Sequence, residues 1–378
     1  MKRWSLPIIA FVAVLGLAGT VVTLTGTVPI KASSGHWGIT EWFLRFSKSR
    51  SVSTYSTGIA VPDNLDTDSR VMKGAGHFET GCASCHGSPI WKQPRIAQRL
   101  TPTPPHLPEK VPDRTDGELF YLVKHGIKFT GMPAFPSSQR DDEVWDMVAF
   151  LRRLPELDEP GYRELVFGAD FNPSRSSTDA PLAVVAVCSR CHGLDGSGRS
   201  TSAFPKLSGL HKNYFVATMQ AYAEGKRHSG MMEPVAARLT DEQIEQIANH
   251  YAGHGQQSSG AEQPASNATS GADSSVDSSS DSSTNESLER GRQIAESGLP
   301  DQDVGACIAC HPTSRSDQNP DYPFLGGQPA DYLVLQIKLF QQRRRGGTAS
   351  ASLMHSIVNK LEAEDIRDVA RYYASLGR

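Results

Sequence analysis

The sequence of 378 residues predicts an all-α protein in which three small, loop-rich units follow an N-terminal transmembrane helix. Three observations lead to this prediction. A C-x-x-C-H segment occurs three times, a long uncharged run precedes all three copies, and amphipathic helical patterns flank the copies. A chain of this length has room for two or three domains, and its 33 Gly and 24 Pro residues suit small domains rich in loops.

The uncharged run extends from Pro7 to Ile30, shortly after Lys2 and Arg3. As a helix it would be about 36 Å long, enough to cross a hydrocarbon core of about 30 Å. Positive charge on the leading side predicts that the start stays in the cytoplasm and that everything after Lys31 is exported.

A signal peptide cleaved near Ala32 is the alternative. Its apolar core would exceed the usual length of about 7–15 residues, and Ile30-Lys31-Ala32 is a poor small-residue cleavage site. The sequence therefore favours residues 1–33 as an uncleaved single-pass anchor in the inner (cytoplasmic) membrane, with the remaining units in the periplasm.

The segment 34–65 mixes aromatic and basic side chains. They are Trp37, Trp42, Phe43, Phe46, Arg45, Lys48 and Arg50. Such a mixture just beyond a membrane span suggests an interfacial segment that lies in the headgroup layer. A docking strip for a membrane partner, or a helix that covers the first unit, would have the same composition.

The C-x-x-C-H copies begin at Cys82, Cys188 and Cys307. This is the attachment signature of c-type haem, in which two thiols bind the porphyrin and the adjacent imidazole binds iron. The predicted cofactor is three covalently bound haem c groups. Their attachment residues are Cys82, Cys85, Cys188, Cys191, Cys307 and Cys310, and the iron-binding histidines are His86, His192 and His311.

A redox dithiol or half of a zinc site is the common alternative for a single C-x-x-C pair. A redox dithiol would need a surrounding βαβ pattern, and a zinc site would need further Cys or His at matching spacing. Neither recurs in this sequence, and no cysteine remains outside the three copies. The sequence therefore favours haem.

The first unit is predicted at residues 66–160. Gly74 and Gly76 precede its haem motif and allow close approach to another helix. The Pro-rich stretch 101–108 excludes regular helix, and helical patterns follow at 117–125 and from Asp141 onward.

The second unit (180–254) and the third (286–378) are copies of one another at an offset of about 120 residues. Phe204-Pro205-Lys206-Leu207 parallels Tyr322-Pro323-Phe324-Leu325, and Tyr214 parallels Tyr332. Between them, residues 255–285 are Ser-rich with hardly an apolar side chain. This composition predicts a disordered linker, which would let the third unit swing between an electron donor and an acceptor.

Methionines are candidates for the second axial ligand of each iron. Met132 lies on a Gly-Met-Pro turn, and Met232 and Met354 each lie seven residues before a leucine of the repeat. Met231 competes with Met232, and only the repeat register selects between them. His228 and His355 are nearby alternatives, but neither has a counterpart in the other copy.

The chain resembles a fusion of class I c-type cytochromes. One single-haem module with the Gly-Met-Pro loop precedes two modules similar to the halves of bacterial diheme cytochromes. The diheme likeness rests on Cys188 to His192, Phe204-Pro205-Lys206-Leu207, Gly225-Lys226-Arg227, Met232 and their repeat partners. It implies three small all-α cytochrome c domains in which the first and last helices cross beside the haem, and iron with His and Met ligands. It also implies that a proline carbonyl orients each imidazole: Pro205, Pro323, and either Pro104 or Pro105.

The expected function is single-electron transfer by a membrane-tethered triheme cytochrome in a bacterial respiratory chain, toward a terminal oxidase. The expected partners are a quinol-oxidising complex, a terminal oxidase or a dehydrogenase. A cytochrome subunit of a periplasmic dehydrogenase is the alternative, and a haem peroxidase with one open iron is a further one. No catalytic residues are expected. The nearly balanced charge, 38 basic and 41 acidic side chains, gives no support for nucleic-acid binding.

Overall fold

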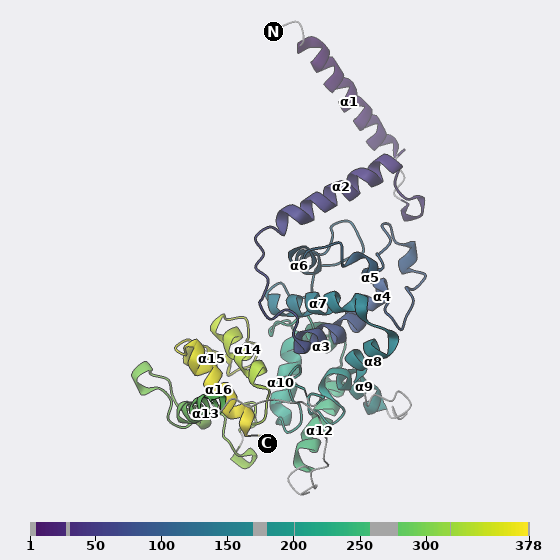
Figure 1. Ribbon diagram of the computed structural model, residues 1–378. Helices are drawn as coiled ribbons and strands as arrows, with labels where there is room; N and C mark the ends of the chain where they lie inside the picture. Colours follow the sequence, from purple (N-terminus) through teal and green to yellow (C-terminus); the bar gives the residue numbers. More distant parts are fainter. Residues whose placement is uncertain are drawn as a thin grey trace.

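The computed structural model describes residues 5–27, 31–168, 180–199, 201–257, 279–317 and 319–376, which form helices joined by loops. No β-strand occurs among these residues, and Leu299 and Val304 form an isolated antiparallel bridge. The prediction of an all-α fold is confirmed. Figure 1 shows one long helix that stands away from a body of packed helices.

Helix α1 (Ser5–Thr25) is the helix that stands away from the body (Figure 1). Its residues Leu6–Thr25 have a mean hydropathy of 2.4 and are not buried against the rest of the protein. The helix is long and apolar enough to cross a membrane, a property that a signal sequence would share. A short 3-10 turn, η1 (Ala32–Ser34), follows it.

Helix α2 (Gly38–Tyr55) runs between α1 and the first unit (Figure 1). Four large apolar side chains recur at i, i+3, i+4 and i+7 and are 54–70% exposed: Ile39, Trp42, Phe43 and Phe46. Near its C-terminal end the helix packs on the first unit, where Val52 is buried and Tyr55 stacks on Tyr121 at 5.9 Å between ring centroids.

The first unit contains helices α3 to α8. They are α3 (Asp68–His77), α4 (Ala83–His86), α5 (Leu107–Lys110), α6 (Asp116–His125), α7 (Asp141–Arg153) and α8 (Glu159–Phe167), with turns η2 (Phe78–Cys82), η3 (Ala97–Arg99) and η4 (Leu154–Glu156). Helix α3 crosses α7 so closely that a Cβ on Gly74 would overlap the carbonyl oxygen of Asp146. Tyr162 and Val166 of α8 are fully buried in the same core. The unit therefore continues past residue 160, where the sequence placed its end.

One prediction is wrong at the end of the Pro-rich stretch 101–108, where Leu107 and Pro108 begin α5. Proline is tolerated in the first turn of a helix because the N–H that it lacks would have no helical partner there.

The second and third units show the predicted repeat as two sets of four helices. The second has α9 (Ala180–His192), α10 (Lys212–Ala223), α11 (Glu233–Ala236) and α12 (Asp241–Gln257). The third has α13 (Ser279–Ser297), α14 (Ala330–Gln341), α15 (Ala351–Val358) and α16 (Ala363–Ser375), with turns η6 (Pro300–Gln302), η7 (Cys307–Ala309) and η8 (Arg315–Asp317). Helix α13 crosses α16 at Gly291, where a Cβ would overlap the carbonyl oxygen of Asp368, as Gly74 would overlap Asp146 in the first unit.

Most of the predicted linker 255–285, namely residues 258–278, lies outside the described residues. At its two ends the chain is helical, since α12 continues to Gln257 and α13 begins at Ser279.

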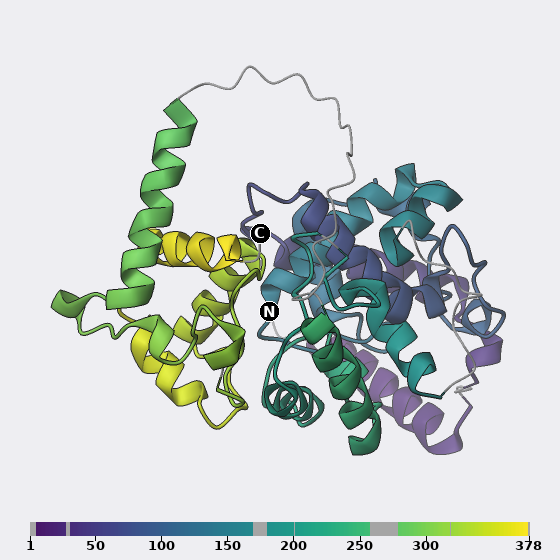
Figure 2. The same ribbon diagram turned by 90° about the horizontal axis from the view of Figure 1, so that it is seen from below.

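The third unit is docked on the second. In Figure 2 the yellow-green group α13–α16 lies beside the rest of the body. Gln328 Oε1 accepts a hydrogen bond from Lys206 N–H at 3.0 Å, and its Nε2 donates to the Lys206 carbonyl at 2.8 Å. The expectation of a swinging third unit is therefore wrong for this structure, because side chains of both units hold them together.

Candidate functional site

Each motif histidine is fixed by a proline carbonyl. The Nδ1 atoms of His86, His192 and His311 lie 3.0, 3.1 and 2.9 Å from the carbonyl oxygens of Pro105, Pro205 and Pro323. A carbonyl only accepts, so Nδ1 carries the proton and Nε2 keeps a free lone pair for a metal. The prediction of proline carbonyl partners is confirmed.

In the first unit the structure selects Pro105 over Pro104. The Pro104 carbonyl instead accepts a hydrogen bond from Gln93 Nε2 at 2.9 Å, and the same amide donates to the Cys85 carbonyl at 2.9 Å. Gln93 therefore ties the Pro-rich loop to the haem motif.

Burial favours the neutral form of the motif histidines and of several motif thiols. Desolvation lowers the pKa of His192 and His311, which favours the uncharged imidazole that binds metals. It raises the pKa of Cys82 and Cys188 to about 12, whereas a redox dithiol needs a lowered thiol pKa. All six cysteines lie in the described residues and none forms a disulfide.

A zinc site also finds no support, because no group of three or more His, Cys, Asp or Glu side chains converges within the described part of the chain.

A cavity of about 360 Å³ connects the motifs of the two repeats. It is lined by the motif residues Cys188, Cys191, His192, Cys307, Cys310 and His311. Met231, Met232 and Met354 line it as well, whereas His86 and Met132 lie outside it. The structure thus brings the predicted residues of the second and third units to one shared space.

The candidate methionines differ in their local setting. Met132 lies on a turn in which its N–H donates to Thr130 Oγ1 at 3.1 Å. Met232 is the residue before α11, whereas Met354 lies inside α15 and not on a loop. Because both Met231 and Met232 line the cavity, the choice of Met232 stays a prediction.

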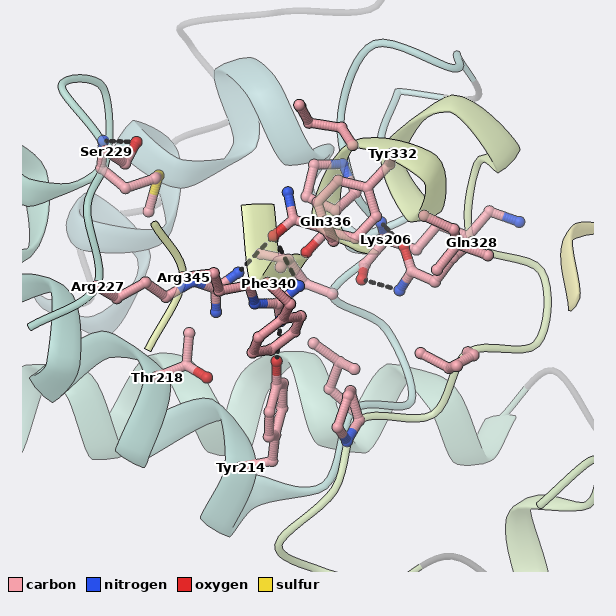
Figure 3. A pocket seen from close by; sticks show the side chains of 18 of the residues that line it. Lys206, Tyr214, Thr218, Arg227, Ser229, Gln328, Tyr332, Gln336, Phe340 and Arg345 are labelled. Atoms are coloured by element: carbon pink, nitrogen blue, oxygen red, sulfur yellow. Dashed lines mark hydrogen bonds between the residues drawn. The ribbon is translucent and has the colours of Figure 1, made fainter. Parts of the chain in front are cut away.

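A buried arginine, Arg227, and a half-buried one, Arg345, lie close together in the lining of the cavity (Figure 3). Arg227 Nη2 and Arg345 Nη1 both donate to Gln336 Oε1, at 3.4 and 2.7 Å, and Arg345 Nη2 donates to the Tyr214 hydroxyl at 3.0 Å. Arg227 is only 6% exposed. Each guanidinium also lies 4.6 Å from the centroid of an aromatic ring five residues earlier, Tyr222 or Phe340.

The side chains that contact the two guanidinium groups in this way are all neutral: Gln336, Tyr214, Tyr222 and Phe340. The charge of the guanidinium groups nevertheless acts on Tyr214: burial raises its pKa, but Arg345 and Arg227 outweigh burial and bring it to about 8. Two adjacent cations with neutral partners, one of them buried, suit an anionic group in the same cavity.

The sequence did not single out Arg345 or Gln336 as site residues, and it noted Arg227 only within a family motif. A signal was present, since Arg227 and Arg345 are 118 residues apart and thus occupy equivalent places in the repeat. The repeat spacing alone does not show that the Arg227 and Arg345 side chains share Gln336 Oε1 as a hydrogen-bond acceptor.

The comparisons with known proteins agree with this geometry. A family described as cytochrome C oxidase, cbb3-type, subunit III, matches residues 69–151, and one described as cytochrome c matches residues 182–251. Cytochrome c4 of Pseudomonas aeruginosa is 32% identical over 198 residues, which are 52% of this chain and 87% of that protein. The chain belongs to the c-type cytochromes.

This cytochrome is also similar to a second curated protein and to a solved structure. A "thiosulfate dehydrogenase electron acceptor" of Stutzerimonas stutzeri is 26% identical over 192 residues, 51% of this chain and 80% of that protein. A crystal structure of reduced recombinant cytochrome c4 from Pseudomonas stutzeri has a TM-score of 0.40 at 24% identity, and covers 53% of this chain and 98% of that chain.

Cytochrome c domains carry covalent haem c, and the residues of this cytochrome fit that group. The motif thiols stand next to imidazoles whose Nδ1 is occupied by a proline carbonyl, and two cationic side chains line the cavity between the repeats, which would suit the carboxylates of a haem bound there. In the repeats, Arg227 and Arg345 would hold those carboxylates.

Proposed function

We propose that this cytochrome is a membrane-anchored triheme carrier, which passes single electrons on the exported side of a bacterial membrane toward a terminal oxidase. The observation that supports this most is present in all three units: a motif histidine donates from Nδ1 to a proline carbonyl and leaves Nε2 for iron. Three such sites correspond to three haems per chain.

Each unit has its own residues for the cofactor. The thioether residues would be Cys82, Cys85, Cys188, Cys191, Cys307 and Cys310, and the axial pairs His86 with Met132, His192 with Met232, and His311 with Met354. Haem iron, when bound, supplies a one-electron couple whose potential a Met ligand raises. With a His and a Met side chain for each iron, no position would be open to oxygen or peroxide, so we assign no catalytic residue.

The mass of the purified chain tests this proposal. We expect three haem additions, and reduced protein that does not bind carbon monoxide tightly. Fewer than three additions would contradict the triheme proposal. Tight carbon monoxide binding would favour the peroxidase alternative, which needs one iron without a sixth ligand.

Two contacts support anchoring of the first unit at the membrane. Thr101 Oγ1 of its Pro-rich loop donates to the carbonyl of Ala32, the first residue of η1, at 2.8 Å. Helix α2 packs on the unit at one end and exposes its apolar stripe at the other. With Arg45, Lys48 and Arg50 on the same helix, this stripe suits a layer of anionic lipid headgroups.

Replacing the stripe tests the headgroup proposal. In the full chain reconstituted in nanodiscs with anionic lipid, Trp42→Ser combined with Phe46→Ser should raise amide hydrogen exchange in α2 about tenfold, because the apolar stripe no longer enters the lipid. Leu44→Ser, on the same helix outside the stripe, is the matched control and should change little. Equal exchange in all three proteins would argue against a lipid contact, and protection only in native membranes would favour a protein partner.

A cytochrome subunit of a periplasmic dehydrogenase is the second candidate. It is favoured by relatives named as electron acceptors of thiosulfate dehydrogenase. Purification from solubilised membranes distinguishes the two, since a terminal oxidase or a quinol-oxidising complex should accompany the chain in the first case and a dehydrogenase in the second.

A further inference from the structure

The segment that carries the Met ligand of the second unit is held by the first unit. We define this second ligand loop as residues 228–232. Ser229 Oγ donates to Glu143 Oε1 at 2.6 Å, and Gly230 N–H donates to Glu143 Oε2 at 2.6 Å. Ser229 Oγ in turn accepts from Met232 N–H at 3.0 Å. The carboxylate of α7 is thus linked to the backbone of Met232 through the Ser229 hydroxyl, by two hydrogen bonds in series.

Arg140 of the first unit also forms a hydrogen bond with the same loop. Its Nη1 donates to the His228 carbonyl at 2.9 Å and lies 2.8 Å from Glu143 Oε1. Asp142 holds the other side of the guanidinium through two hydrogen bonds of 2.9 and 2.7 Å. Arg140 and Glu143 are 7% and 5% exposed, so both contacts are shielded from water.

The ligand loops of the first two units also touch each other. Phe135 lies three residues after Met132, and a Cβ on Gly230 would overlap its ring. Nearby, a Cβ on Gly76 of α3 would lie 2.9 Å from Sγ of Cys191. The first unit therefore contacts the second at its ligand loop and at one of its haem-attachment residues.

The third unit has a different arrangement around Met354. The neighbouring His355 Nε2 lies 2.7 Å from the Arg345 carbonyl of the same unit. Because Met354 lies within α15, helical hydrogen bonds hold its backbone. The loop before Met232 is held instead by Glu143 and Arg140 of another unit, together with Glu233 of its own unit, whose Oε1 accepts from Ser229 N–H at 2.7 Å.

From this geometry we infer that Glu143 is a positioning residue for the axial ligand of the second unit, so that docking of the first unit sets the potential of the second haem. The inference rests on the proposed haem ligation by Met232. Glutamate suits this role because both of its oxygens accept, and the loop presents two donors at the matching spacing.

Glu143→Gln in the full-length haem-loaded protein tests the inference. The amide keeps the size of the side chain but can accept at one oxygen only, so one of the two donors of the loop loses its partner. We expect the affinity of the ferric second haem for imidazole to rise about tenfold, its potential to fall, and the Gly230 amide to exchange about tenfold faster. Ser229→Ala should change all three in the same direction.

Asp141→Asn is the matched control. It removes a carboxylate from the same first turn of α7, but this carboxylate pairs with Lys124 of the first unit at 2.6 Å. It should leave the second haem unchanged. If Met232→Ala moves one potential while Glu143→Gln and Ser229→Ala move none, Glu143 has no positioning role. If Met232→Ala itself moves no potential, the ligation by Met232 fails instead.

Discussion

Met132→Ala, Met232→Ala and Met354→Ala are each expected to remove about one third of the far-red Met-to-iron absorption and to lower one reduction potential by on the order of 100 mV. A thioether is a soft ligand that favours ferrous iron, and each methionine would serve one iron only. Redox titration with visible spectroscopy measures both effects, and the two unaltered haems serve as internal references.

Met231→Ala is the control for this series, because Met231 and Met232 are neighbours that line the same cavity. It should leave the far-red band and all three potentials unchanged. The reverse result, with an effect of Met231→Ala and none of Met232→Ala, would identify Met231 as the ligand and would show that the repeat register misassigns the second unit.

Gly74→Val is expected to destabilise the first unit by about 3 kcal/mol or more. An added Cβ would overlap the Asp146 carbonyl oxygen and would lie 2.6 Å from the Cβ of Phe150, so α3 and α7 must separate. Backbone atoms cannot yield as a flexible side chain can. Native-state hydrogen exchange of amides in α3 and α7 measures this loss unit by unit, which a single unfolding curve of a multi-unit chain would not.

Gly291→Val provides the parallel case, since the same overlap occurs with Asp368 where α13 crosses α16. Gly253→Ala in α12 is the control, because space is open there and alanine favours helix by up to about 1 kcal/mol. If Gly74→Val left exchange in the first unit unchanged, the close crossing of α3 and α7 would not contribute to its stability.

Local patterns were enough to predict the helices around the haem motifs. The charged ends of α7, with acids from Asp141 onward and Arg152 and Arg153 last, marked both of its bounds. The prediction failed at Leu107 and Pro108, and it ended the first unit before Tyr162. The first error is local, because a single helical turn such as α5 has little sequence pattern of its own. The second has a tertiary cause, because only packing shows that α8 completes the core.

The candidate site divides in the same way. The proposed Cys, His and Met positions come from spacing along the chain, because haem attachment involves residues adjacent in sequence and a repeat is expected to place its ligands alike. Contacts of Glu143 with Ser229, of Arg227 with Gln336, and of Arg345 with Tyr214 join residues of different units. In the sequence Glu143 reads as one of three acids in the first turn of a helix, and nothing local distinguishes it from Asp141.

The sequence by itself determined that this protein is an all-α c-type cytochrome with three haem motifs, a tandem repeat and an apolar N-terminal segment. Only the tertiary structure decided that the two repeats share one cavity lined by two arginines and that the third unit is docked on the second. It also decided that side chains of the first unit form hydrogen bonds with the ligand loop of the second. The physical reason is the distance along the sequence over which each property acts. Motifs and helical periodicity are local properties of a chain, whereas buried charges acquire their partners only when surfaces far apart in sequence meet.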